Sequence, residues 1–259
     1  MNYTAPSYLA PYLLVGVIAS IATLLFGLKS ALRRAAWPEK EQAKAFWSLA
    51  ALLVTWFAFA LETSLAGWYG GAARRVPTIQ FGLLIPIIAG VLLFRTWPLL
   101  RRTIAAIPNQ WLVGVQFYRT LGLIFLALYA GGRLSALFAL PAGVGDVSVG
   151  LLAPFAAAAY SRSSSGAAGR LRLWNYLGIA DLVIAVTLGF LTSPSPLQLA
   201  SFDRPSVLVG VFPLALIPVY MVPLSILLHF ASLKRLRDAE GRGTRTDVRR
   251  EVKPSMQLS

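Results

Sequence analysis

The chain has 259 residues, of which 57% are hydrophobic and only 13% charged, and its formal net charge is +14. Because about a quarter of the residues in soluble domains are charged, this composition excludes a water-soluble globule, a disordered chain and a coiled coil, and it predicts an integral membrane protein. The sequence has no cysteine, which excludes disulfides, thiolate nucleophiles and cysteine-held metals, haems or iron–sulfur clusters.

Seven segments are long and apolar enough to cross a membrane. A helix needs about 20 apolar residues to span a hydrocarbon core of about 30 Å, and its backbone polar groups must be paired internally. The sequence predicts an all-α fold, a polytopic transmembrane helix bundle, in which residues 1–236 form a single transmembrane domain. The predicted spans are residues 8–28, 45–68, 77–94, 111–131, 136–160, 173–192 and 207–233.

The distribution of lysine and arginine predicts the orientation of the bundle. Nineteen of the 24 basic residues lie in the C-terminal tail and in the connections after the first, third and fifth spans, whereas four lie in the other connections. Positively charged flanks are retained in the cytoplasm. We therefore expect an external N-terminus and a cytoplasmic C-terminus. The net charge then records orientation and predicts no nucleic-acid partner.

Three polar connections have a recognisable character. Residues 98–108 begin and end with proline and mix Leu and Ile with Arg101 and Arg102, which fits either a short helix in the membrane interface or a plain loop. Residues 161–170 are rich in Ser and Gly, as in a flexible linker. Residues 237–259 are polar and basic, and we expect them to form a disordered cytoplasmic tail.

Four ionisable residues lie inside the predicted spans: Glu62 in the second, Arg119 in the fourth, Asp146 in the fifth and Asp181 in the sixth. Ionisable groups in a membrane interior cost a few kcal/mol and usually mark functional sites. Arg119 and Asp181 share a depth, so we expect them to form an ion pair. Glu62 and Asp146 then have no evident cation, which indicates either protonation or a bound cation.

Small and polar residues surround these charges. Asp146 lies between Gly143 and Gly150 on one helical face, which allows close helix packing and points the acid toward protein. Gln116 and Asn175 add polar groups to the fourth and sixth spans. We expect a polar centre between spans four to seven. The alternative is that these side chains only bind the helices to one another.

The seventh span contains three prolines and the only histidine. Pro213, Pro218 and Pro223 each remove a backbone donor, which fits a hinge, free carbonyls for a cation, or only a passive kink, as prolines are common in membrane helices. His229 lies near Lys234, and we expect it at the membrane interface. A single histidine excludes bis-histidine haem ligation and multi-histidine metal sites, so we expect no metal and no cofactor.

Part of the chain resembles a known family. The segments PNQWLVGVQFYRTLG, LFALPAGVGDVSVGLLAP, TSPSPLQ and FPLALIPVYMVPLSILLHFASLKRL are similar to a family of uncharacterised bacterial polytopic membrane proteins. The resemblance covers about residues 108–236. It implies a seven-helix bacterial membrane protein, here of the inner membrane, and no activity carries over.

These patterns favour a protein that binds or translocates a small cationic or anionic solute or an ion, with proton coupling left open. Arg119 would orient an anionic group or neutralise Asp181, while Asp146 and Glu62 would take protons or cations. A second class is an accessory subunit that docks a partner membrane protein, a second copy or lipid. A third is an intramembrane lipid-modifying enzyme with the two aspartates as acid and base. No catalytic motif is present in the sequence to decide for an enzyme.

Overall fold

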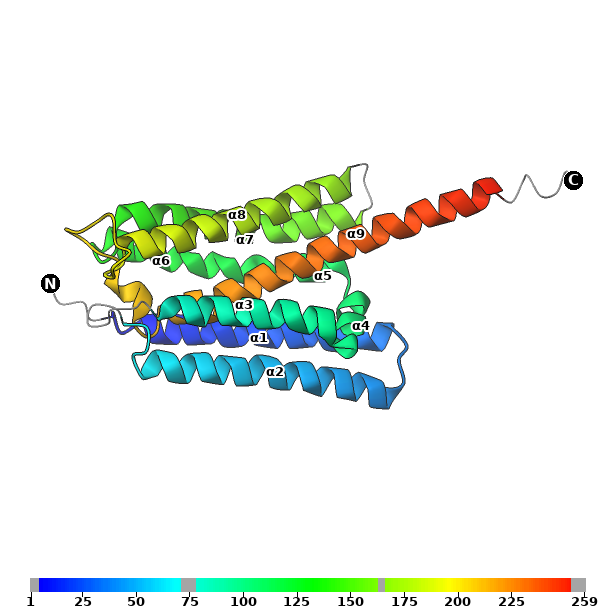
Figure 1. Cartoon of the computed structure of the whole chain (residues 1–259), viewed down its shortest axis with the longest axis horizontal. Coiled ribbons are helices and arrows are strands. Elements are labelled where there is room, and N and C mark those ends of the chain that lie inside the picture. Colours follow the sequence, from blue (N-terminus) through cyan, green and yellow to red (C-terminus); the bar gives the residue numbers. More distant parts are fainter. Residues whose placement is uncertain (1–4, 71–77, 163–165, 253–259) are drawn as a thin grey trace, which may run out of the picture.

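The computed structural model describes residues 5–70, 78–162 and 166–252, with residues 242–252 described by their backbone alone. Every regular element in these residues is a helix (Figure 1). The elements in chain order are α1 (Leu9–Arg34), α2 (Glu39–Leu65), α3 (Ile79–Thr96), α4 (Pro98–Ala106), α5 (Asn109–Gly114), η1 (Val115–Gly122), α6 (Leu123–Ala130), α7 (Ala136–Ser161), α8 (Ala167–Thr192), η2 (Val207–Gly210), η3 (Ile217–Met221) and α9 (Val222–Val252).

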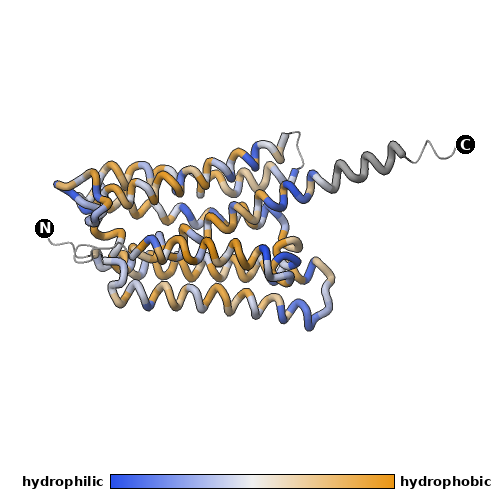
Figure 2. The backbone as a smooth tube through the Cα atoms, in the orientation of Figure 1, coloured by the Kyte–Doolittle hydropathy of each residue, from blue (hydrophilic) through white to orange (hydrophobic). Residues whose placement is uncertain are grey.

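Seven helical stretches in the described residues are long and apolar enough to cross a membrane, and each overlaps one predicted span. The fourth is built from α5, η1 and α6 in succession, over Asn109–Ala130. Hydrophobic residues fill most of the helix length, while hydrophilic residues gather toward the two ends (Figure 2). The prediction of an all-helical bundle is therefore confirmed for the described residues, and so is the prediction of seven segments that are long and apolar enough to span a membrane.

The helix ends follow local sequence chemistry. Ser135 precedes α7 and its hydroxyl accepts a hydrogen bond from the Leu137 amide, which satisfies one free donor of the first turn. α8 is preceded by Gly166, whose φ of 72° is a left-handed conformation that suits glycine. The last turn of α1 contains Arg33 and Arg34, whose positive charges complement the helix dipole.

The bundle consists of two groups of helices joined by α9. In one group α7 packs against α5, η1, α6 and α8, and in the other α1 packs against α2. α9 contacts α5 and α8 on one side and α3 on the other. We call the end where α1 begins the N-terminal end, and the opposite end, where α4 lies, the α4 end (Figure 1).

The seventh span begins later than predicted. Residues 207–216 form η2 and turns, with a cis peptide bond before Pro213, and the span itself begins with the π-helical segment η3. Pro213 and Pro218 lack the amide hydrogen that a regular helix needs at these positions, so the start of the span departs from α geometry.

α9 also continues beyond the predicted end of the span. Residues 237–252, for which composition predicts disorder, extend the helix as far as Val252 (Figure 1). Lys, Arg, Glu and Ala are good helix formers, and Lys234 pairs with Asp238 one turn later at 3.1 Å. A basic composition in this stretch is thus compatible with a helix.

The structure describes the whole of one of the two other polar connections and most of the second. Residues 98–106 form the short helix α4 rather than a loop, with Leu100 and Thr103 buried and Arg101 and Arg102 exposed. The Ser- and Gly-rich linker is reduced to the residues between Ser161 and Ala167, of which 163–165 lie outside the described residues.

Candidate functional site

Arg119 lies on a 3-10 segment in the middle of the fourth span. A 3-10 helix has three residues per turn, so Gln116 and Arg119 share one line of η1, and both are buried. α7 approaches this segment at Gly150, where an added Cβ would lie 2.7 Å from the backbone nitrogen of Thr120. Glycine in α7 therefore lets the backbone of η1 lie close enough to aim Arg119 between α7 and α8.

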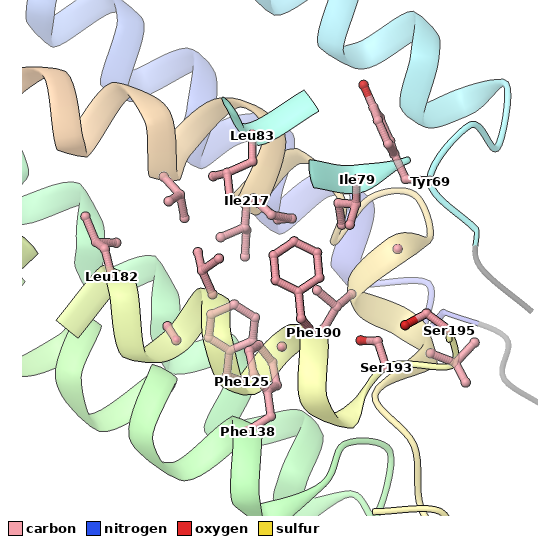
Figure 3. A pocket seen from close by; sticks show the side chains of 18 of the residues that line it. Tyr69, Ile79, Leu83, Phe125, Phe138, Leu182, Phe190, Ser193, Ser195 and Ile217 are labelled. Atoms are coloured by element: carbon pink, nitrogen blue, oxygen red, sulfur yellow. The ribbon is translucent and has the colours of Figure 1, made fainter. Parts of the chain in front are cut away.

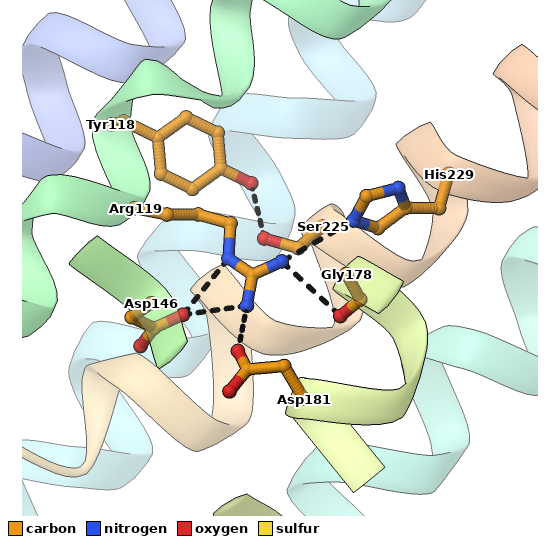
Figure 4. Close-up of polar contacts among 7 residues, drawn as sticks. All are labelled: Tyr118, Arg119, Asp146, Gly178, Asp181, Ser225 and His229. Carbon is orange, nitrogen blue, oxygen red and sulfur yellow. Dashed lines mark hydrogen bonds and ion pairs between the residues drawn. The ribbon is translucent and has the colours of Figure 1, made fainter. Parts of the chain in front are cut away.

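Each of the three nitrogens of the Arg119 guanidinium contacts at least one neighbouring group (Figure 4). Nε donates to Asp146 Oδ1 at 2.9 Å, and Nη2 lies 2.8 Å from the same oxygen. Nη2 also pairs with Asp181 Oδ2. Nη1 donates to the Gly178 carbonyl at 3.2 Å and lies 3.3 Å from His229 Nε2. Arg119 is 3% exposed, so these contacts replace its hydration.

The protonated nitrogen of His229 follows from its neighbours. Asn175 Nδ2 donates to the Leu171 carbonyl at 2.8 Å and to Ser232 Oγ at 3.0 Å, which identifies the other amide atom as oxygen. That oxygen lies 2.9 Å from His229 Nδ1 and can only accept. Nδ1 therefore carries the hydrogen. Nε2 faces the Arg119 donor with its lone pair, so the imidazole is neutral in this arrangement.

The acidic groups outnumber the cation. With neutral His229, the cluster of Arg119, Asp146 and Asp181 has a formal charge of −1 when both carboxylates are ionised. Arg119 contacts one oxygen of each carboxylate, Oδ1 of Asp146 and Oδ2 of Asp181. The second oxygens receive no hydrogen bond from any residue that the structure describes, so they can accept one from a ligand.

A cavity lined by Asp146 lies between this cluster and the N-terminal end. Figure 3 shows its apolar walls and the two serines at one end. The cavity has a volume of about 90 Å³, starts beside Ser193 and Ser195, and reaches Asp146 between apolar walls that include Phe125, Phe138, Leu182 and Phe190. A second cavity of about 20 Å³ also includes Asp146, and it is lined by Tyr118, Arg119 and Ser225. The larger cavity has room for several water molecules and the smaller for about one.

The other side of the cluster is closed. Between the cluster and the α4 end, eight side chains pack into a buried apolar group formed by Val113, Val149, Ala153, Ala157, Leu171, Trp174, Leu233 and Leu236. Asp146 thus lies at the inner end of a cavity that starts at the N-terminal end, and the apolar group separates the cluster from the α4 end.

The structure brings together most of the predicted site. The Arg119–Asp181 pair is confirmed, and Asn175 joins the cluster through His229. Asp146, predicted to lack a cation, instead shares Arg119 with Asp181. This prediction was wrong because it rested on depth along each helix, whereas the close approach of η1 and α7 brings a second acid to the same guanidinium. Gln116 is fully buried, and its amide makes no hydrogen bond to the described residues.

Glu62 does not belong to the cluster. It is exposed near the end of α2, on the other side of the bundle from α7 and α8 (Figure 1). A carboxylate close to the end of a span reaches the polar boundary of the membrane and needs no buried partner. The position of Glu62 inside a predicted span therefore did not by itself indicate a functional site.

His229 was predicted at the interface but is fully buried beside Arg119. Its neighbours on α9 were also missed: Ser232 bonds Asn175, and Ser225 lies 2.7 Å from the hydroxyl of Tyr118. Ser225, His229 and Ser232 are spaced by four and three residues, so they form one polar line on an otherwise apolar helix. This spacing is the pattern in the sequence that could have predicted that the three side chains face the same side of α9.

The three prolines of the seventh span lie at three successive places at its start, and one of them lines the larger cavity. Pro218 lies in η3 and lines the larger cavity, Pro213 lies in the turn before η3, and Pro223 lies in the first turn of α9. Among the described residues, no group of three or more His, Cys, Asp or Glu side chains is arranged to hold a metal ion.

A family model for a domain of unknown function, DUF8737, matches residues 76–237. The chain belongs to this family. The DUF8737 match contains every residue of the cluster and the helices from α3 to the membrane-spanning part of α9, whereas α1, α2 and Glu62 precede it. It agrees with the prediction that the chain belongs to an uncharacterised family, and it begins before the 108–236 segment that carried the resemblance. No curated protein and no solved structure matches this DUF8737 chain.

Proposed function

We propose that this protein binds and translocates a small cation across the inner membrane of a bacterium, and that protons compete for or accompany that cation at Asp146 and Asp181. The observation that carries the proposal is the sharing of one buried arginine by two carboxylates, the partly buried Asp181 and the buried Asp146, which lines a cavity. The solute is cationic because the cluster has one negative charge in excess.

The proposed orientation rests on the basic residues at the α4 end. The end of α1, the whole of α4 and the start of α8 all lie there and contain lysine or arginine (Figure 1). Positively charged flanks favour the cytoplasm, so the N-terminal end and the mouth of the cavity face outward in this proposal.

An anionic solute fits this site poorly. All three guanidinium nitrogens of Arg119 already contact protein groups, and drawing Arg119 away from Asp146 would leave a buried carboxylate without its partner, at a cost of about 3–5 kcal/mol. A monovalent cation near the second oxygens of Asp146 and Asp181 is instead attracted by the carboxylates. At 4 Å, opposite unit charges attract by about 4 kcal/mol in an environment with an effective dielectric constant of 20.

The proposed site also differs from a simple structural ion pair. A pair that only joins helices is best enclosed on all sides, whereas Asp146 borders two cavities. A cation or proton on Asp146 would weaken its attraction to Arg119, which would remain bound to Asp181 and His229. Arg119 would then move within the 3-10 segment η1, and this movement is the proposed link between binding of the cation and its translocation.

Flux measurements on the full chain in liposomes test this function. A pH-sensitive dye inside the vesicles reports proton movement when gradients of Na⁺, K⁺ and tetramethylammonium are imposed in turn. We expect at least one gradient to drive proton movement above that of empty vesicles, and Asp146→Asn to reduce it at least tenfold. Glu62→Gln is the matched control, because it removes a carboxylate from α2 outside the cluster. Equal flux in Asp146→Asn and wild type would overturn the assignment.

One observation favours a second candidate, an accessory subunit that docks a partner protein. α9 extends beyond the bundle at the α4 end, where Arg172 of α8 pairs with Glu240 of α9 (Figure 1). In that case the full chain would purify with another protein in a fixed ratio, and removing residues 241–259 would abolish the association without changing the unfolding temperature of the bundle.

A further inference from the structure

A second feature of the bundle is a long apolar groove between α2 and α3. These two helices are consecutive spans, but the groove between them reaches α9, where Leu224, Leu228 and Ala231 contribute to its lining. Trp68 and Phe81 lie toward its N-terminal end. The groove has a volume of about 620 Å³ and runs along the bundle as far as α4. It is separate from the cavity that reaches Asp146, although both include Tyr69.

The lining of the groove indicates its occupant. The lining is almost wholly apolar and includes side chains of α1, α2, α3, α4 and α9. A narrow, flexible hydrocarbon chain fits both the volume and the apolar lining of the groove.

One end of the groove combines apolar and basic groups. Leu100 and Ile104 of α4 line the groove, whereas Arg101 and Arg102 on the same short helix are exposed. The guanidinium of Arg102 lies 4.7 Å from the ring centroid of Trp37, which holds it beside the bundle while more than half of its side chain stays exposed. Basic groups at the membrane surface next to a gap between helices favour anionic lipid headgroups.

We propose that this groove is a binding site for an anionic phospholipid of the leaflet at the α4 end. One acyl chain lies between α2 and α3, and the headgroup phosphate is bound by Arg101 and Arg102. Arg102 also pairs with Glu41 of α2 at 3.0 Å, so the phosphate shares this arginine with a carboxylate. The site is independent of the Arg119 cluster and of the proposed transport.

Lipid titration of the full chain, followed by native mass spectrometry, tests the site. The delipidated protein is mixed with phosphatidylglycerol or phosphatidylcholine that have the same acyl chains. We expect phosphatidylglycerol to bind at least threefold more tightly. Arg101→Gln with Arg102→Gln should remove this preference. Arg162→Gln with Arg170→Gln, which removes the same charge near the α7–α8 connection, should preserve it.

A substitution inside the groove tests the position of the acyl chain. Ala89 lines the groove, and Ala89→Trp should lower the binding of both lipids at least fivefold. Ile88→Trp is the matched control, because the neighbouring Ile88 is 57% exposed and does not line the groove. Equal binding of the two lipids to wild type, equal binding to the two tryptophan variants, or a dimer that only Ala89→Trp disrupts would each overturn the proposal.

Discussion

Gly122 of η1 faces Asp146 of α7 so closely that a Cβ on the glycine would lie 2.5 Å from the Cβ of the aspartate. This contact fixes the distance at which Arg119, three residues earlier, meets its first carboxylate. A glycine at position 122 is thus needed for the geometry of the cluster.

The variant Gly122→Ala should therefore disturb both stability and flux. Overpacking at a tight contact costs about 1–3 kcal/mol, and here it would push Asp146 away from Arg119. Thermal unfolding in detergent, followed by the fluorescence of the tryptophans, should show a lower unfolding temperature. Gly114→Ala is the control, because a Cβ there would lie 3.8 Å from Ala157, an ordinary contact. If the two variants unfold alike, the packing account of Gly122 is wrong.

Removing Arg119 should be more harmful than removing the whole charge cluster. Arg119→Leu leaves the buried Asp146 and the partly buried Asp181 without a cation, which costs about 3–5 kcal/mol. The triple variant Arg119→Leu, Asp146→Asn, Asp181→Asn has no uncompensated charge, so most of the lost stability should return. Proton-coupled flux should stay absent in both variants. Recovery of flux in the triple variant would show that transport does not depend on the charge cluster.

The single histidine allows a direct test of the hydrogen-bond network. Nitrogen-15 NMR of the protein in liposomes should show one histidine ring, with the hydrogen on Nδ1. In Asn175→Leu the acceptor for that hydrogen is lost, and the Nε2–H form should become populated. The unfolding free energy should fall by about 1–3 kcal/mol, since a buried donor loses its partner. A predominantly Nε2–H signal in the wild type would contradict the assigned tautomer.

Gln116 should show opposite effects on stability and on flux. Its buried amide has no hydrogen-bond partner among the described residues, so Gln116→Leu should raise stability by about 1 kcal/mol. Flux should fall if the amide serves the moving cation, because leucine offers it no oxygen. Gln110→Leu, at an exposed position of α5, should change neither quantity. Unchanged flux in Gln116→Leu would show that Gln116 takes no part in the pathway of the cation.

The sequence could predict the spans because length and apolar composition decide membrane insertion of each helix by itself. The pairing of Arg119 with Asp181 could be predicted as well, because depth in the membrane can be counted along each helix. These quantities are local, and they require no knowledge of how the helices rotate or how close they pack.

The rest of the site depends on contacts between helices. The 3-10 geometry of η1 and the second acid on Arg119 result from packing against the glycines of α7. His229 was assigned to the wrong environment because its nearest charges in the sequence, such as Lys234, lie beyond the span, whereas its partners Arg119 and Asn175 come from other helices. For Glu62 the prediction of a carboxylate without a cation agrees with the described residues, in which no ion pair of Glu62 is found.

The unbroken path of α9 has a mechanical consequence. The helix extends from the π-helical segment beside the cavity, through His229, and on to Val252 beyond the bundle. At about 1.5 Å per residue, the part after His229 is about 35 Å long, so a tilt of 5° at the histidine displaces its far end by about 3 Å. α9 thus has the geometry of a lever arm, in which a small tilt beside the buried charges would become a larger displacement of the far end of the helix beyond the bundle.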